Sequence, residues 1–224
     1  MLLHRMQSLL ARLYDAPVAH EAQDFLLSDP RRLREVLGEQ VPGNWSERGP
    51  QSDEQVFMVQ EEGGVRIGLF IDQQVLDRLD RHDPLDCLDE RNLSDYCTAL
   101  EGVSHFHYLI WSLSRGRPVS LLELELQAEV DKYAIALSLL VRQRAGLFPE
   151  ALHGWLFDAV SFLPQLDEAS RRRYEEANRH AARYCRSLEE RFMRPRRARP
   201  EQWLAELRRF FRCGHQEKIR QLAV

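Results

Sequence analysis

Apolar residues recur every three or four positions over most of the chain, a spacing that places them on one face of an α-helix. This pattern predicts helices over residues 2–14 and 18–27. In the segment "SDPRRLREVLG", Asp29 is expected to cap a helix that begins at Pro30 and stops at Gly38. From residue 73 to the C-terminus the pattern stays helical, with breaks near prolines and glycines.

One stretch alternates instead of following the helical period. Residues 55–71 form two β-rich runs on either side of the sequence "EEGG", and this arrangement predicts a β-hairpin. A loop rich in Pro, Gly, Asn and Ser is expected before it, at residues 41–52. Because an isolated hairpin is only marginally stable in water, its apolar face must pack against other elements.

These patterns predict a mainly α fold: a multi-helix, bundle-like domain with one β-hairpin, at about residues 55–71, packed against it. The chain is expected to divide into N-terminal helices and a loop at residues 1–52, the hairpin at 53–72 and a helical body at 73–224. A length of 224 residues suits one globular domain that contains all three parts.

Two long helices, at residues 91–115 and 120–143, are joined by a very short turn and should therefore lie antiparallel. Ser120, with a glutamate three residues later, is expected to form a capping box. If both helices rise at ~1.5 Å per residue, facing residues have numbers that add up to roughly 234. His105 is then expected beside Glu129, and Glu101 near Lys132 and Tyr133.

Several acids and histidines share faces of these helices, and a later helix repeats the pattern of Glu and His four residues apart. Carboxylates and imidazoles that converge from facing helices hold metal ions in helical bundles. The usual spacing in such bundles is Glu-x-x-His, so the spacing of four is a departure. The candidate metal ligands are Glu101, His105, Glu125, Glu129, Glu176 and His180.

The same side chains also suit a buried network of paired charges, because buried charges need partners. In that interpretation Glu101 pairs with Lys132, His105 pairs with Glu129, and arginines of the later helix neutralise the remaining carboxylates. Solvated helix faces are a third interpretation. His107 should point away from His105, toward the surface or a second interface. The further members of the network are Lys132, Tyr133, Arg179, Arg183 and Tyr184.

The charge is unevenly distributed along the chain. The net charge is −4, but residues 171–220 carry 16 Lys and Arg against 7 Asp and Glu, a balance of +9 that leaves −13 for the remainder. Attraction between the two parts is one explanation. The other is a site for phosphate or an acidic partner, with Arg194, Arg196 and Arg197 as candidate residues. Acidic residues interrupt the basic runs, which disfavours a nucleic-acid partner.

The remaining sequence features exclude several classes of protein but do not identify a function. The four cysteines form no C-x-x-C pair, and the sequence has no signal-peptide pattern; both features favour a reduced, cytoplasmic protein. No run of ~20 apolar residues is present, so no membrane span is expected. Nucleotide-binding and hydrolase motifs are absent, so no catalytic residue is assigned and the question of enzymatic activity stays open.

The expected function is therefore a cytosolic helical interaction or regulatory module that binds a protein partner or a second copy of itself. The alternative is a helical-bundle metalloprotein, such as a di-metal oxidase, with Fe or Mn held by Glu and His from facing helices. A weaker alternative is phosphate or nucleic-acid binding through residues 171–220.

Overall fold

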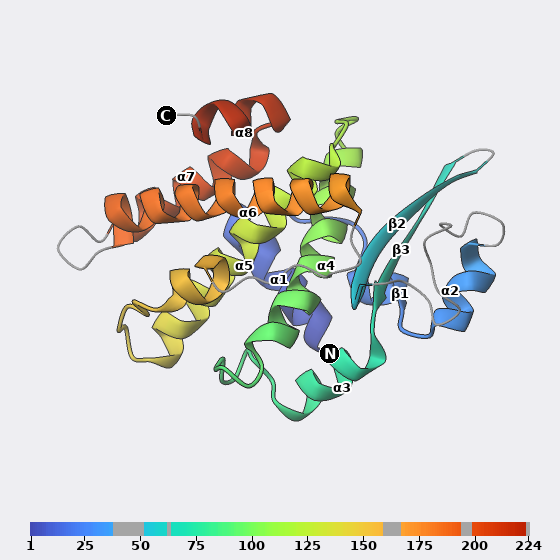
Figure 1. The fold of residues 1–224 in the computed structure, drawn as a ribbon, viewed down its shortest axis with the longest axis horizontal. Helices are drawn as coiled ribbons and strands as arrows, with labels where there is room; N and C mark the ends of the chain where they lie inside the picture. The colour runs from blue at the N-terminus through green and yellow to red at the C-terminus, as the bar shows by residue number, and fades with distance from the viewer. Residues whose placement is uncertain (38–51, 62–63, 159–166, 194–198, 223–224) are drawn as a thin grey trace.

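The computed structural model describes residues 1–37, 52–61, 64–158, 167–193 and 199–222. As predicted, these residues are mainly helical, and a small sheet packs against the helices (Figure 1). The helices are α1 (Leu2–Tyr14), α2 (Pro30–Leu37), α3 (Gln73–Arg81), α4 (Leu93–Leu113), α5 (Leu121–Gln143), α6 (Glu168–Leu188), α7 (Pro200–Arg212) and α8 (His215–Leu222). Short π-helical turns, Gly154–Asp158 and Glu189–Met193, precede and follow α6.

The predicted hairpin is confirmed as β2 (Glu54–Glu61) paired antiparallel with β3 (Gly64–Ile71). A third strand, β1 (Leu26–Leu27), pairs parallel with β3, so the sheet order is β1-β3-β2. The sequence pattern did not predict β1.

The helix predicted over residues 18–27 is wrong. That segment forms a 3₁₀ turn, Ala22–Phe25, and then enters β1. Gln7 of α1 explains the difference, because its buried amide binds the segment twice. Its Oε1 accepts a hydrogen bond from Ala22 N at 2.7 Å, and its Nε2 donates to His20 O at 2.8 Å. Backbone groups held in this way do not form helical hydrogen bonds.

Helix starts follow the predicted capping chemistry. Asp29 Oδ1 accepts a hydrogen bond from Arg31 N at 2.8 Å, at the start of α2. Ser120 Oγ accepts one from Glu123 N at 3.2 Å, at the start of α5. Only half of the expected capping box forms there, because the Glu123 carboxylate instead accepts hydrogen bonds from Tyr108 and Arg117. Gly38 and nearly all of the loop predicted at residues 41–52 lie outside the described residues.

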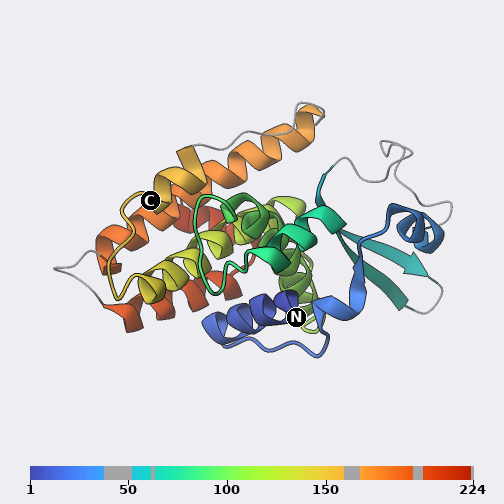
Figure 2. The same cartoon turned by 90° about the horizontal axis from the view of Figure 1, so that it is seen from below.

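α4 and α5 form the centre of the molecule (Figures 1 and 2). α1, α3 and the hairpin pack on α4, and α6 packs on α5. α4 is therefore buried on almost all sides, and Leu100, Val103 and Phe106 are fully inaccessible to solvent. This position explains why its sequence is apolar all round, as expected of a helix in a core.

The hairpin has two packed faces. Leu69 and Ile71 on one face join the main core, and Phe70 on the other packs with Leu33 and Leu37 of α2. At Gly102 of α4, an added Cβ would lie 2.9 Å from Leu69 Cδ1 and 3.1 Å from Glu54 Oε2. The absence of a side chain at this position allows β2 and β3 to approach α4 closely.

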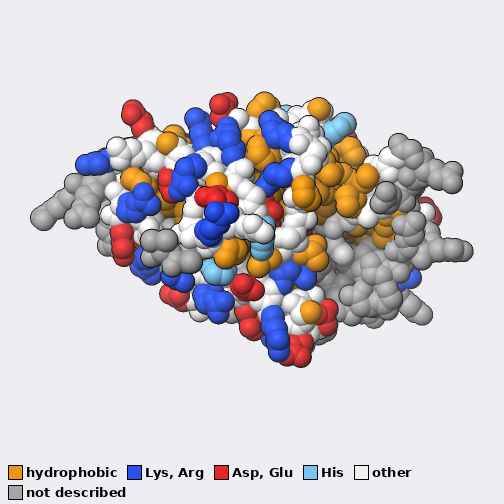
Figure 3. Space-filling model, turned by 90° about the horizontal axis from the view of Figure 1, so that it is seen from above, with side chains coloured by type: hydrophobic (Ala, Val, Ile, Leu, Met, Phe, Trp, Pro, Cys, Tyr) orange, Lys and Arg blue, Asp and Glu red, His pale blue; other side chains and the backbone are white. Residues whose placement is uncertain are grey.

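The basic C-terminal region contacts the N-terminal helix. Arg208 of α7 donates hydrogen bonds to Leu13 O at 2.9 Å and to Arg12 O at 3.3 Å, and Arg212 donates to Tyr14 O at 3.0 Å. These are the free carbonyls at the end of α1, which cationic groups satisfy well. On the face drawn in Figure 3, basic side chains alternate with acidic and apolar ones. Within the described residues, no helix has the length and apolarity to cross a membrane.

Candidate metal centre

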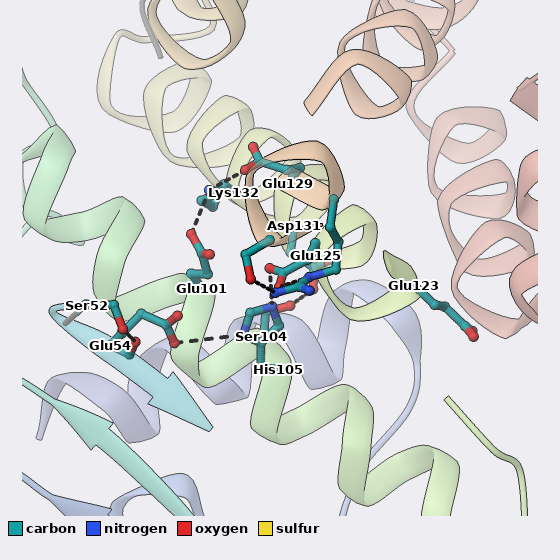
Figure 4. Close-up of polar contacts among 12 residues, drawn as sticks. Ser52, Glu54, Glu101, Ser104, His105, Glu123, Glu125, Glu129, Asp131 and Lys132 are labelled. Carbon is teal, nitrogen blue, oxygen red and sulfur yellow. Dashed lines mark hydrogen bonds and ion pairs between the residues drawn. The ribbon is translucent and has the colours of Figure 1, made fainter. Parts of the chain in front are cut away.

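Two long helices and one strand bring three acidic side chains and an imidazole together. Glu101 and His105 lie one turn apart on α4, Glu125 comes from the first half of α5, and Glu54 is the first residue of β2 (Figure 4). Figure 4 shows Glu54 directed from β2 toward His105. The Glu54 and Glu125 carboxylates therefore reach the imidazole from different elements of the fold.

The imidazole of His105 lies between two carboxylates. Its Nε2 is 3.3 Å from Glu125 Oε2, and its Nδ1 is 3.8 Å from Glu54 Oε2. Glu101, His105 and Glu125 each offer one ligand atom, and these three atoms lie within 4.8 Å of one another. The side chains of His105 and Glu125 are 8% exposed, so bulk water is largely excluded.

Three buried polar atoms of this group, Glu54 Oε2, His105 Nε2 and Glu125 Oε2, make no well-aligned hydrogen bond with a described residue, and their contacts with one another are ion pairs at 3.3 and 3.8 Å. Buried polar atoms usually make well-aligned hydrogen bonds, and these atoms would be satisfied either by a proton on His105 or by a metal ion that they share. Two ligands bound at about 2.1 Å to one ion, at roughly 90–110° to each other, are about 3.0–3.4 Å apart. The 3.3 Å between His105 Nε2 and Glu125 Oε2 therefore fits neighbouring ligands of one metal ion.

Two cations flank the group. Lys132 Nζ donates hydrogen bonds to Glu101 Oε2 and to Glu129 Oε1, each at 2.8 Å. Arg173 of α6 lies 3.3 Å from Glu125 Oε1 through its Nε. Four carboxylates thus face two permanently charged cations, which leaves an excess of negative charge for a proton or a metal ion to balance.

The pKa values of Glu54, His105, Glu101 and Glu129 reflect burial and this excess of negative charge. Burial raises the pKa of Glu54 to about 7, although His105 opposes the shift. Burial also acts on His105, but the carboxylates of Glu125 and Glu54 outweigh it and hold the imidazole pKa well above its usual value. Burial raises the pKa of Glu129. The pKa of Glu101 is lowered, because the charges of Lys132 and His105 outweigh burial.

The predicted register of α4 and α5 is only partly followed. Glu101 contacts Lys132 as expected, but the expected contact between His105 and Glu129 does not form. His105 contacts Glu125 instead, and Glu129 binds Lys132. A constant sum of residue numbers assumes parallel helix axes, and helices that cross at an angle depart from it increasingly with distance from the closest approach.

Glu176 and His180 pair with each other on α6, with 3.5 Å between His180 Nε2 and Glu176 Oε1. Among the described residues they are not part of the Glu101–His105–Glu125 group, and neither is Glu129. His180 is seven residues beyond Arg173, which corresponds to ~10 Å along the helix. The structure thus brings three of the six candidate ligands together.

The buried charge network also has other members than the sequence predicted. Arg179 and Arg183 are exposed, and the arginine of α6 that reaches the carboxylates is Arg173, which the sequence did not single out. Tyr133 donates a hydrogen bond to Glu189 Oε1 at 2.6 Å, and Tyr184 donates one to Glu206 O at 3.3 Å. Arg194, Arg196 and Arg197 lie outside the described residues.

His107 was expected at the surface or at a second interface, and the surface prediction is wrong. The residue is 1% exposed, and its ring centroid lies 6.2 Å from that of Phe211. Burial lowers its pKa to about 4, so this imidazole is neutral near pH 7. Phe211 of α7 covers this side of α4, and a periodicity argument within one helix does not reveal that contact.

A second buried polar cluster lies apart from the candidate metal group. Asp131 accepts hydrogen bonds from Tyr14, from Ser104 at 2.6 Å and from Gln127 at 2.7 Å. Lys218 of α8 donates to Gln127 Oε1 at 2.6 Å. Every member has a partner, so this cluster joins α1, α4, α5 and α8 as a structural network.

Comparisons with known proteins do not add a family: the chain matches no family model, no curated protein and no solved structure. The functional argument therefore depends on the geometry above.

Proposed function

We propose that this chain binds one divalent metal ion through Glu101, His105 Nε2 and Glu125. The observation that supports the proposal most is the convergence of two buried atoms, His105 Nε2 and Glu125 Oε2, which lack a well-aligned hydrogen bond and lie 3.3 Å apart, the spacing of neighbouring metal ligands. Glu54 faces the other nitrogen, Nδ1, as an orienting carboxylate would. Such a carboxylate fixes the tautomer of a metal-binding histidine.

The ligand set narrows the choice of ion. Carboxylates suit Mg, Ca and Mn, whereas imidazole suits Zn, Cu, Fe and Ni. Two carboxylates and one imidazole together favour Mn(II) or Fe(II). Three protein ligands leave coordination positions open for water or a substrate, which is a property of catalytic metal sites rather than closed structural ones.

The surroundings favour one ion over two. A second ion of a dinuclear centre would lie between Glu101 and Glu129, since it would share a carboxylate with the first. Lys132 Nζ already lies there, 2.8 Å from an oxygen of each. The ammonium group supplies the second positive charge, so we expect a stoichiometry of one metal ion per chain.

The proposal is tested by metal analysis of protein purified without chelator, followed by titration of the metal-free protein with Mn(II) and, without oxygen, with Fe(II). We expect one ion per chain. His105→Ala should lose binding at least a hundredfold. His180→Ala is the matched control, because it removes a histidine with the same Glu–His spacing on α6 and should bind the ion normally.

A wild-type protein that neither carries nor takes up an ion would contradict the proposal. The cluster would then be a charge network, in which His105→Ala lowers the free energy of unfolding by about 1–3 kcal/mol because the buried Oε2 of Glu125 loses its ion pair while only Oε1 keeps Arg173. The interaction or regulatory module inferred from the sequence would in that case be the leading hypothesis for function.

A further inference from the structure

A cavity of about 500 Å³ opens beside the candidate metal group. It lies between the N-terminal half of α4, the middle of α5 and the π-helical turn Gly154–Asp158. Glu101 belongs both to the cavity wall and to the candidate ligand group. A cavity of this volume is within the range of small-molecule sites.

The charged part of the wall is a row of three side chains, Glu101, Lys132 and Glu129 (Figure 4). Lys132 binds one oxygen of each carboxylate, so its charge is already offset by two acids. Glu101 and Glu129 keep 18% and 13% of their side-chain surface exposed, and both line the cavity. With Glu90 at the exposed rim, the charged groups facing the cavity are three carboxylates and one ammonium.

The rest of the wall is apolar and includes an aromatic ring. Leu93, Cys97 and Leu156 line it together with Trp155. Burial raises the pKa of the Cys97 thiol to about 12, which keeps it in the neutral form near pH 7. The Trp155 ring attracts positive charge, and Arg144 already lies near it, with its guanidinium carbon 6.0 Å from the ring centroid. The indole beside excess carboxylates is a favourable environment for a further organic cation.

We propose that this cavity binds a primary amine in its ammonium form, with an apolar or aromatic body. The ammonium group would donate a hydrogen bond to the free oxygen of Glu129 and, in the metal-free protein, to that of Glu101, and the body would pack on Trp155 and Leu93. An anion is disfavoured, because Lys132 is fully engaged by its two carboxylates. Amine binding does not depend on the proposed metal site.

The test uses 2-phenylethylamine as the probe, with 2-phenylethanol and 3-phenylpropionate as its neutral and anionic counterparts. Binding is followed by calorimetry and by tryptophan fluorescence. We expect the amine to bind at least tenfold more tightly than the alcohol, and the acid not to bind. The fluorescence change should disappear in Trp155→Phe, which removes the reporter indole.

Two variants test the position of the ammonium group. Glu129→Gln should weaken amine binding at least tenfold, whereas Glu176→Gln, an acid on α6 outside the cavity lining, should not. In Lys132→Met the carboxylate pair loses its internal cation, so the amine should bind at least tenfold more tightly than in wild type. Lys132→Met keeps the proposal testable if Glu129→Gln does not fold.

The two proposals fail separately. The metal-free His105→Ala variant should still bind the amine. If it does, and if the wild-type protein takes up no metal ion, only the metal proposal is contradicted. Equal affinity for amine and alcohol, or an amine affinity unchanged in Lys132→Met and Glu129→Gln, would overturn the amine proposal even if a metal ion binds.

Discussion

Glu54 shows at the scale of one residue what the sequence left out of the candidate site. Its carboxylate faces His105 Nδ1, and its neighbours in sequence suggest only the start of a strand. Glu101, His105 and Glu125 were identified because helical spacing places side chains on known faces. The contact of a strand with a helix depends on how the hairpin docks, which periodicity does not determine.

The pKa of His105 gives the first prediction at this scale. A metal ion must displace the proton from Nε2, and the carboxylates hold the imidazole pKa well above its usual value. Metal affinity should therefore rise at least tenfold between pH 6 and pH 8, with release of protons on binding. Calorimetric titrations in buffers of different ionisation enthalpy measure both quantities.

Glu54→Gln is the informative variant for this prediction. It removes the negative charge beside Nδ1, so the imidazole pKa should fall and the rise in metal affinity should shift to lower pH. Loss of the orienting carboxylate should also weaken binding by about 10–100-fold at pH 8. The same affinity at pH 6 and pH 8 in wild type would contradict the assignment of His105 as a ligand.

Glu54 also affects the metal-free protein, with a defined sign. Its pKa in the folded state, about 7, lies above the ordinary value of 4.5, so folding favours the protonated carboxyl. The stability it contributes is present below about pH 4.5 and is lost as the pH rises to about 7. The same variant, Glu54→Gln, should reduce this dependence.

At the scale of elements, Gly102 explains how the hairpin reaches the site. A glycine inside a helix costs about 1 kcal/mol relative to alanine, so it needs a structural reason. The reason is the contact of α4 with β2 and β3, where a Cβ would lie 2.9 Å from Leu69 and 3.1 Å from Glu54. The glycine was visible in the sequence, but the element packed against it was not.

Gly102→Ala is therefore expected to displace Glu54 from His105. Metal affinity should fall at least fivefold. Helix propensity alone would raise the free energy of unfolding of this variant by about 1 kcal/mol. We expect no such gain, because the added methyl group meets Leu69, which is fully buried and has little room to move. Metal titration and chemical denaturation measure the two effects. A more stable variant with unchanged metal affinity would show that the hairpin does not position Glu54.

For the whole molecule, the sequence predicted the helical architecture and the hairpin, because both depend on local periodicity and turn chemistry. It did not predict β1 or the turn before it, because a two-residue strand and a segment held by the Gln7 side chain leave no periodic signal. The uneven charge was correctly noted. In the structure, arginines of the basic C-terminal region make two kinds of contact within the chain: Arg173 contacts Glu125, and α7 contacts the end of α1.

The α7–α1 contacts connect distant parts of the chain, and they give the prediction at this scale. Arg208 donates two hydrogen bonds to carbonyls at the C-terminal end of α1, while its neighbour Arg209 binds, among the residues that the structure describes, only Glu206 of its own helix. Arg208→Ala should lower the free energy of unfolding by about 1–2 kcal/mol, since it leaves helix-end carbonyls without a cationic donor.

Arg209→Ala is the matched control for charge and should change stability by less than about 0.5 kcal/mol, as expected for an exposed pair one turn apart. Denaturant unfolding of both variants makes the comparison. Equal effects would mean that the basic residues of α7 act only through net charge, and the surplus of arginine would then need a partner outside the chain. A selective loss in Arg208→Ala would instead mean that at least part of this surplus holds the two ends of the fold together.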